Sequence, residues 1–414
     1  MKEIAKRVLG NRDLHRVFWI LLATPFFTPA ILGVLEGTEL LETLFDLWRF
    51  GAAAVIAALY LWQFFFKRRL PALHTLLFGL YLLAVTVSSF IHAENYSFVL
   101  TYVVTLMGFF LLLELSLRDS PQMLLDMLFY PLSLLIAINF ILLCLFPNGL
   151  CTGGTYGYDY NFLGIDNFIG PILIPYMSLA VLRSDYMYGD LTLSTWILLG
   201  VSTLTCLLLW SATALMAMAA ALFFILFFYH RRLAHWFNGV TALLPSLGMF
   251  FGIVLFRLQN LFAFLIEGIL HKGLSFTGRT EIWDTAIEKI LASPYLGWGV
   301  GQRGKVYRLS KYKFYHAHNL YLELMMEGGI LGAIPFMLLV ARCTDSLMQH
   351  RKCRAASIIS GGLLSCGIMT CMEPYLDTNG VLIYALVFLG CSVGAFTGGP
   401  NADAPALTHK QSEA

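Results

Sequence analysis

Long apolar runs alternate with short polar segments along almost the whole chain. A helix that crosses a bilayer needs about 20 predominantly apolar residues, and most of these runs approach that length. The runs lie at 17–35, 47–66, 70–91, 97–117, 123–146, 167–182, 193–209, 211–229, 238–256, 319–341, 355–372 and 380–398. The pattern predicts an all-α polytopic membrane protein with about 12 transmembrane helices.

The composition agrees with a membrane protein and excludes several other classes. The chain has 414 residues, of which 58% are hydrophobic and 13% are charged, and a mean hydropathy of +0.73. Because a soluble domain carries about 25% charged residues, a soluble enzyme, a disordered protein and a nucleic-acid binder are excluded. The eight cysteines show no zinc-site spacing and are interpreted as helix-packing residues.

The distribution of Lys and Arg predicts the orientation. With a cytoplasmic N-terminus, 17 of the 27 cations fall in inner segments, and nine of the other ten lie between Arg257 and Lys313. No cleavage site follows the run 17–35, so we expect an uncleaved first helix rather than a signal peptide. The predicted organisation is nine helices in 1–256, a large extracytoplasmic loop at 257–318, three helices in 319–398 and a cytoplasmic tail at 399–414.

The outer loop contains one helical pattern. Apolar residues recur at helical spacing at Trp283, Ile287, Ile290 and Leu291. Thr280 is the predicted N-cap, and the acidic residues that follow it suit the helix dipole. The helix either lies amphipathically on the membrane surface or packs under the loop. Arg279 at the start of this helix could bind an anion, together with the free backbone N–H groups of the first turn.

Two further features follow in the loop. The stretch 294–301 has three alternating glycines, which permit tight turns or close backbone approach, and it lacks the sequence of a phosphate-binding P-loop. A basic segment then presents Arg303, Lys305, Arg308, Lys311 and Lys313. On an outer membrane face these cations match an anionic lipid head group or a pyrophosphate, and the alternative is a solvated face without a ligand.

The loop ends at His316 and His318, where the chain re-enters the bilayer. In a helix, Asn319, Glu323 and Glu327 share one face, and buried carboxylates at membrane depth are usually functional. Glu323 is therefore expected to face a cavity. A metal site at the two histidines is not favoured, because no carboxylate lies at ligand spacing outside the helix.

These motifs resemble the bacterial O-antigen ligase/polymerase (Wzy-type) membrane proteins. The matching residues are Gly278-Arg279, Trp283, Pro294, Gly297-Trp298-Gly299, His318-Asn319 and Gly329-Ile330-Leu331-Gly332. The resemblance implies a GT-C-like, metal-independent glycosyltransferase without a cofactor. Its implied substrate is an undecaprenyl-pyrophosphate-linked oligosaccharide, with Arg279 binding the pyrophosphate and His318 acting as catalytic base, and Glu323 is added to these as a catalytic candidate.

One part of the family pattern is missing. The segment Trp210-Ser211-Ala212-Thr213 lacks the arginine that the family often has at the outer start of a central helix. Either Ser211 and Thr213 bind the phosphates, or another cation such as Arg257 or Arg303 does, with Lys305 and Arg308 as further candidates. Candidate acceptor or sugar residues, chosen by polarity and location, are His316, Asn319, Asp159, Glu373 and Asp377.

The resulting hypothesis is polymerisation of lipid-linked repeat units into O-antigen, capsule or exopolysaccharide on the outer face of the bacterial cytoplasmic membrane. The alternatives are an O-antigen ligase acting on a lipid A core, a lipid-linked glycan transporter and a non-catalytic assembly partner. The expected partners are the lipid-linked oligosaccharide, membrane lipid, and chain-length regulator and flippase proteins, with no nucleic acid.

Overall fold

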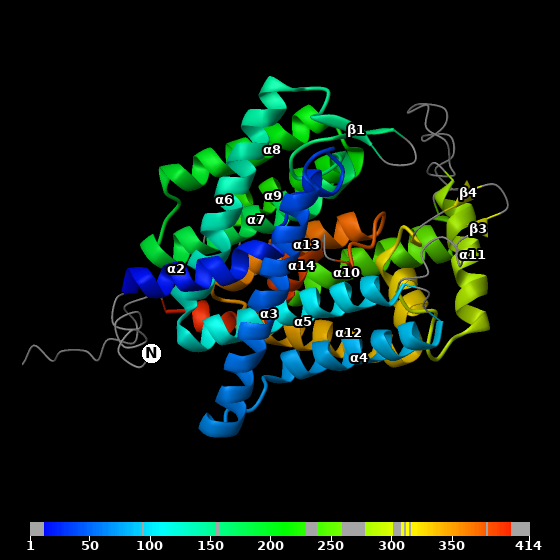
Figure 1. The fold of residues 1–414 in the computed structure, drawn as a ribbon, viewed down its shortest axis with the longest axis horizontal. Helices are drawn as coiled ribbons and strands as arrows, with labels where there is room; N and C mark the ends of the chain where they lie inside the picture. The colour runs from blue at the N-terminus through cyan, green and yellow to red at the C-terminus, as the bar shows by residue number, and fades with distance from the viewer. Residues whose placement is uncertain are drawn as a thin grey trace, which may run out of the picture.

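The computed structural model describes residues 12–92, 95–153, 157–228, 238–258, 278–300, 308–309, 312–313, 316–377 and 380–398. Figure 1 shows a helical bundle with α11 at one end of it. The helices are α2 (Arg12–Ala23), α3 (Glu39–Lys67), α4 (Leu73–His92), α5 (Tyr96–Asp119), α6 (Pro121–Leu145), α7 (Asp166–Tyr188), α8 (Leu193–Leu209), α9 (Ala212–Phe228), α10 (Gly239–Met249), α11 (Arg279–Ala292), α12 (Leu320–Gln349), α13 (Arg354–Thr370) and α14 (Val381–Cys391). Two short antiparallel hairpins pair β1 (Cys151–Gly153) with β2 (Tyr158–Tyr160) and β3 (Arg308–Leu309) with β4 (Tyr312–Lys313).

Each of the twelve predicted apolar runs contains a helix, which confirms the all-helical prediction. Among the described residues, α3, α4, α5, α6 and α12 are long and apolar enough to cross a membrane. Helices α8, α9, α10 and α14 are apolar but shorter, and α10 is continued by a π-helical turn at Phe250–Leu255. The fold is that of a helical membrane protein, while the number of twelve spans and the GT-C likeness stay predictions.

The first predicted run is not one continuous helix, so this part of the prediction is wrong. Helix α2 ends at Ala23, and 3₁₀ turns follow at Thr24–Phe26 and Ala30–Gly33. Pro25 and Pro29 lie in this stretch, and proline lacks the N–H that would continue the α-helix. An apolar run therefore does not guarantee an unbroken helix when it contains prolines.

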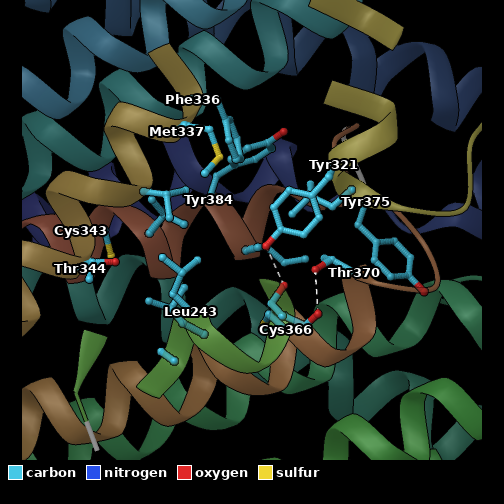
Figure 2. A pocket seen from close by; sticks show the side chains of 18 of the residues that line it. Leu243, Tyr321, Phe336, Met337, Cys343, Thr344, Cys366, Thr370, Tyr375 and Tyr384 are labelled. Carbon is cyan, nitrogen blue, oxygen red and sulfur yellow. Dashed lines mark hydrogen bonds between the residues drawn. The ribbon is translucent and has the colours of Figure 1, made fainter. Parts of the chain in front are cut away.

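Helices α10, α12, α13 and α14 leave a cavity between them. Figure 2 shows side chains from these helices around it, among them Leu243, Phe336, Met337 and Cys366. The cavity has a volume of about 110 Å³.

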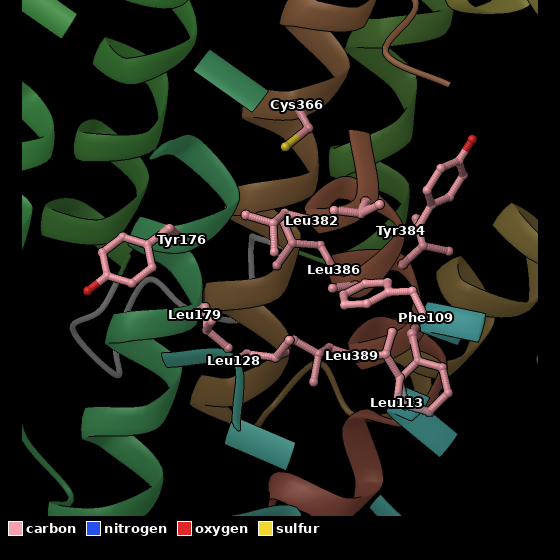
Figure 3. Packing of buried hydrophobic residues seen from close by; sticks show 14 of the residues in the cluster. Phe109, Leu113, Leu128, Tyr176, Leu179, Cys366, Leu382, Tyr384, Leu386 and Leu389 are labelled. Atoms are coloured by element: carbon pink, nitrogen blue, oxygen red, sulfur yellow. The ribbon is translucent and has the colours of Figure 1, made fainter. Parts of the chain in front are cut away.

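The main hydrophobic core surrounds α14. This helix has only 11 residues and is apolar on every side, as expected for a helix with no water-facing side. Figure 3 shows its Leu382, Leu386 and Leu389 packed with Phe109 of α5 and Leu179 of α7. The core therefore fixes the C-terminal helices against the first half of the chain.

Helix α12 is broken at Gly329, where φ is +55°. The turn after α11 fills the break: the N–H groups of Trp298 and Gly299 donate to Met326 and Glu327 (2.6 and 3.0 Å), and those of Ile330 and Leu331 donate to the carbonyls of 294 and 295. A backbone interrupted at membrane depth needs such partners. The two glycine-rich motifs of the sequence therefore form one contact.

That contact explains why glycine is required. A Cβ on Gly297 would lie 2.6 Å from the Met326 carbonyl oxygen, and one on Gly329 would lie 2.4 Å from the carbonyl group of Tyr295. Both residues also have positive φ, which glycine adopts without steric cost. The predicted close backbone approach at 294–301 is confirmed for the residues up to 300. Gly301 lies outside the described residues.

Candidate active site

Four side chains from three separate segments meet beside the start of α12. Arg279 opens α11, His316 and His318 precede α12, and Glu373 lies in the turn between α13 and α14. Glu373 Oε1 accepts from Arg279 Nη2 at 2.9 Å and from His318 Nδ1 at 2.8 Å, and Glu373 Oε2 lies 3.5 Å from His316 Nε2. We call these four residues the outer cluster.

The carboxyl group of Glu373 is held ionised by its neighbours. Burial by itself raises its pKa, but the hydrogen bond and charge of His318, with the charges of His316 and Arg279, lower the pKa to about 2. Glu373 is 5% exposed. Opposite charges within a few ångströms of a buried carboxylate have this effect. The cluster therefore carries a fixed negative charge among three cationic or basic groups.

Glu373 also fixes which nitrogen of His318 can accept a proton. A carboxylate only accepts hydrogen bonds, so Nδ1 of a neutral His318 carries the hydrogen and Nε2 carries the lone pair. The side chain of His318 is 21% exposed, which leaves room for a substrate. This is the arrangement that a general base needs.

The backbone of His318 adopts a sparsely populated conformation. Its φ is +48°, and its N–H donates to His316 Nδ1 at 3.3 Å. The two imidazole rings are 4.1 Å apart between centroids. A non-glycine residue at positive φ costs roughly 1–3 kcal/mol and persists only where the surroundings enforce it. The turn therefore holds His318 in one orientation.

Two buried polar residues of α12 hold this turn. Asn319 is fully buried and caps α12 by accepting from the N–H groups of Tyr321 and Leu322, while it donates to the Cys371 carbonyl at 3.1 Å. Glu323 is 2% exposed, and its Oε2 accepts from the Ala317 N–H at 2.6 Å. These bonds connect the histidine turn to α12 and to the α13–α14 turn, which supports positioning roles.

The start of α11 is built to receive an anion. The helix begins at Arg279 after Gly278, which has φ +84° and supplies no side-chain cap, so the first N–H groups keep their capacity to bind an anion. The prediction of Thr280 as N-cap is wrong, because the left-handed glycine starts the helix two residues earlier. Arg279 Nε is buried and has no hydrogen-bond partner among the described residues.

A second arginine reaches the same helix end. Arg257 Nη2 donates to the Thr280 carbonyl at 3.2 Å and to Asp284 Oδ1 at 2.5 Å, and its guanidinium lies 5.1 Å from the centre of the Trp283 ring. Its Nη1 is buried without a hydrogen-bond partner in the described part of the chain. Arg257 thus occupies a position suited to the second phosphate anchor.

Helix α11 packs against the protein. Trp283 and Ala286 are fully buried against Val254, Leu322 and Met326. Ile287 and Ile290 are partly buried as expected, whereas Leu291 is 73% exposed. Leu291, the last residue of the helical pattern, is therefore turned away from α12. The burial is provided by α12 and the π-helical turn at Phe250–Leu255, and the two interpretations, a helix on the membrane surface and a helix packed under the loop, stay predictions.

The remaining predicted residues lie at several places. Ser211 donates to Asn167 Oδ1 at 2.8 Å, and Thr213 is half-buried in α9. Asp159 accepts from Thr152 within the β1–β2 hairpin. Asp377 lies four residues after Glu373. The pKa of Tyr375 is raised mainly by burial and by the charge of Glu373, and the charge of Asp377 adds a smaller increase. Arg303, Lys305 and Lys311 lie outside the described residues, as do the side chains of Arg308 and Lys313.

Glu327 is buried away from the outer cluster. It is 2% exposed and accepts from Tyr81 at 3.3 Å and from Tyr102 at 3.1 Å. These tyrosines come from α4 and α5. The carboxyl group therefore connects α12 to two neighbouring helices, next to the break at Gly329.

The three acid and imidazole residues also form a possible metal site. One ligand atom each from His316, His318 and Glu373 lies within 4.8 Å of the others. The sequence analysis did not favour a metal because no carboxylate lies at ligand spacing from the histidines outside the helix. It did not consider Glu373, which lies 55 residues beyond His318 in the sequence. However, Arg279 shares Glu373 Oε1 with His318, and a guanidinium at this distance repels a cation.

Comparison with known proteins points to the same part of the chain. Residues 197–337 match the family model described as O-antigen ligase. A curated O-antigen ligase of Pseudomonas aeruginosa is 26% identical over 154 residues, which is 37% of this chain. The resemblance to the O-antigen ligase/polymerase family is confirmed.

The extent of these matches limits what they say. The aligned part spans about a third (35%) of the length of the curated ligase. The family match contains Arg279 and His318 but ends before Glu373. Both matches are described as O-antigen ligase, so they do not distinguish the predicted polymerase, and the ligase alternative fits them better. With the apolar helices, the family indicates a multi-pass inner-membrane protein.

Proposed function

We propose that this protein is a glycosyltransferase of the O-antigen ligase type. It moves a glycan from a lipid-pyrophosphate carrier to a hydroxyl group of an acceptor, with a lipid A core as the acceptor class. The single observation that supports this most is the outer cluster, in which a positioned imidazole lies beside an arginine at an uncapped helix start.

The chemistry divides between the two sides of the cluster. His318 Nε2 takes the proton of the acceptor hydroxyl as its oxygen attacks the anomeric carbon of the glycan. The bond from that carbon to the phosphate oxygen breaks, and its electron pair leaves with the lipid pyrophosphate. Arg279, Arg257 and the N–H groups of α11 stabilise the negative charge that develops there.

Glu373 supports the transfer without reacting. It orients the imidazole of His318 through Nδ1 and stabilises the imidazolium that forms when Nε2 accepts the proton. It also holds Arg279 at the site. We therefore regard Glu373 as a positioning residue, whereas the sequence predicted a sugar-binding residue.

The test is transfer by the purified protein in detergent. The donor is a lipid-pyrophosphate-linked glycan, and the acceptor is a lipid A core. We expect transfer by the wild type, loss of it in Arg279→Ala and His318→Ala, and wild-type rates in the exposed control Glu288→Gln on α11. Wild-type rates in both site variants would contradict the proposal.

The same assay separates the ligase from the alternatives. A ladder of longer glycans from donor alone, without the core acceptor, would identify a polymerase instead. If no product forms with or without the core acceptor, while the protein moves the donor across the membrane of lipid vesicles, the protein is a transporter.

A further inference from the structure

Two buried tyrosines bond to the carboxyl group of Glu327 in α12. Glu327 Oε2 accepts from Tyr81 of α4 at 3.3 Å and from Tyr102 of α5 at 3.1 Å, and the two hydroxyl oxygens lie 3.3 Å apart. All three side chains are at most 2% exposed. A carboxyl group buried among membrane-spanning helices is costly, and such groups usually serve a function. The contacts of these tyrosines indicate what that function is.

The tyrosines lead to the turn that carries Glu373. The Leu376 carbonyl oxygen lies three residues after Glu373 and accepts from Tyr384 of α14 at 2.6 Å and from Tyr102 at 3.2 Å. The Tyr102 hydroxyl group therefore lies between the Glu327 carboxyl group and this carbonyl, and its single hydrogen can bond to either. Figure 3 shows the hydroxyl group of Tyr384 pointing away from the leucines of the core. We call Glu327, Tyr81, Tyr102 and Tyr384 the tyrosine cluster.

The same turn is also held at its other end by α12. Asn319 Nδ2 donates to the Cys371 carbonyl at 3.1 Å, two residues before Glu373. Between the two anchors, Tyr375 has a φ of +45°, a conformation that a bulky residue keeps only where its surroundings enforce it. The position of the Glu373 carboxyl group is thus fixed from both sides, by Asn319 and by the tyrosine cluster.

Glu327 also contacts the segment that follows α11. Its main-chain carbonyl accepts from the Gly299 N–H at 3.0 Å, and α11 itself begins at Arg279. A buried polar network whose members are bonded to one another is rigid. One residue of α12 therefore adjoins both the segment that carries Arg279 and, through Tyr102, the turn that carries Glu373.

We propose that the tyrosine cluster positions Glu373 for the transfer reaction, by holding its carboxyl group at hydrogen-bond distance from His318. The inference rests on the proposed function, because it explains how the imidazole of His318 is kept in its productive orientation. If the turn moved by about 1 Å, the 2.8 Å bond between Glu373 and His318 would exceed hydrogen-bond distance. A misplacement of about this size can reduce a rate roughly 100-fold. The members of the cluster act through Glu373 and are positioning residues.

The test removes single hydroxyl groups and measures transfer by the purified protein in detergent, from a lipid-pyrophosphate-linked glycan to a lipid A core. Tyr102→Phe breaks the connection between the carboxyl group and the turn, while Tyr81 still donates to Glu327 and Tyr384 still donates to Leu376. Tyr384→Phe removes the shorter of the two bonds to the turn. Phenylalanine keeps the ring in both variants, so the packing is preserved.

Further variants separate positioning from general stability. Tyr176→Phe is the matched control, because Tyr176 of α7 is 1% exposed, as Tyr102 is, and its hydroxyl group bonds to Ser133 instead of to the turn. Glu327→Leu removes the acceptor of the cluster, and Glu327→Gln is its conservative counterpart, which keeps an oxygen for the two tyrosines. Folding of every variant is checked by thermal melting.

We expect Tyr102→Phe and Tyr384→Phe to lower kcat roughly tenfold and to change the KM for the donor less than about twofold, since the cluster acts on the base and not on the pyrophosphate. Glu327→Leu should lower kcat by a similar factor, and Glu327→Gln should recover most of it. Tyr176→Phe should keep the wild-type kcat. In a Glu373→Gln background, the tyrosine replacements should have little further effect, because the charge that they position is already absent.

Two results would overturn the proposal. Wild-type kcat in both Tyr102→Phe and Tyr384→Phe would show that the turn does not need these bonds. An equal loss in Tyr176→Phe, or a full additional loss in the Glu373→Gln background, would make the tyrosine cluster a part of the general packing.

The proposed function fails in a different way. If the wild type transfers no glycan, or if His318→Ala is as active as the wild type, the glycosyltransferase assignment is wrong. If transfer depends on His318 but not on the tyrosine cluster, only the positioning role of the cluster is wrong.

Discussion

Replacement of Glu373 by glutamine removes one charge from the outer cluster and little else. Glutamine has nearly the same shape, so its oxygen can still accept from Arg279 and His318. What is lost is the negative charge that stabilises the imidazolium formed when His318 takes a proton. Glu373→Gln therefore tests the electrostatic part of the mechanism.

The pKa of Glu373 gives the size of the effect. The carboxyl group has an ordinary pKa of 4.5, and the cluster lowers it to about 2. At 1.36 kcal/mol for each pKa unit, the cluster favours the ionised form by about 3 kcal/mol. If the transition state loses this amount, kcat falls roughly 100-fold. The KM for the donor should not rise, because the glutamine oxygen still accepts from Arg279 and keeps it in place to bind the pyrophosphate.

Steady-state transfer from the lipid-linked donor measures both quantities. Glu288→Gln serves as the control, since it removes one exposed carboxylate from the neighbouring helix α11. Glu373→Asp keeps the charge and should recover part of kcat. Unchanged kcat with an increased KM in Glu373→Gln would refute the positioning role and return Glu373 to the sugar-binding role predicted from the sequence.

Four other predictions concern the fold and the site. Gly329→Ala should lower the free energy of unfolding by at least about 2 kcal/mol, measured by thermal melting, whereas Gly332→Ala should be tolerated because its Cβ meets only ordinary contacts at 3.7 Å. Arg257→Ala should raise the KM for the donor roughly tenfold with less effect on kcat, since a charge-assisted bond contributes about 1.5–3 kcal/mol, and an unchanged KM would exclude it as an anchor. Because the pKa of Glu373 is lowered in the folded protein, its ionised carboxylate stabilises the fold fully above about pH 4.5, and this stabilisation is lost as the pH falls towards 2. The melting temperature of the wild type should therefore decrease between pH 4.5 and 2, and that of Glu373→Gln should decrease less. Because Arg279 shares Glu373 Oε1 and repels a cation, neither a chelator nor micromolar Zn²⁺ should change transfer by the purified protein, and stimulation by Zn²⁺ would contradict metal-independent transfer.

Local features of the sequence determined most of the helices. Apolar runs of membrane length define their own helices, because a backbone in lipid must satisfy its hydrogen bonds within the segment. The period of Trp283 and Ile287 identified α11 for a similar local reason. Arg279 and His318 were recognisable as candidates from their order and their placement outside the apolar runs.

Only the tertiary structure brought distant residues together. Glu373 meets His318 across 55 residues, Arg257 reaches the start of α11, and the turn at 294–299 fills the break in α12. Leu291 fits the helical period but faces outward. Periodicity states which side of a helix is apolar, but not which neighbour covers it. That is decided by how the helices pack around α14, and the packing alone turned a histidine, an arginine and a glutamate into one site.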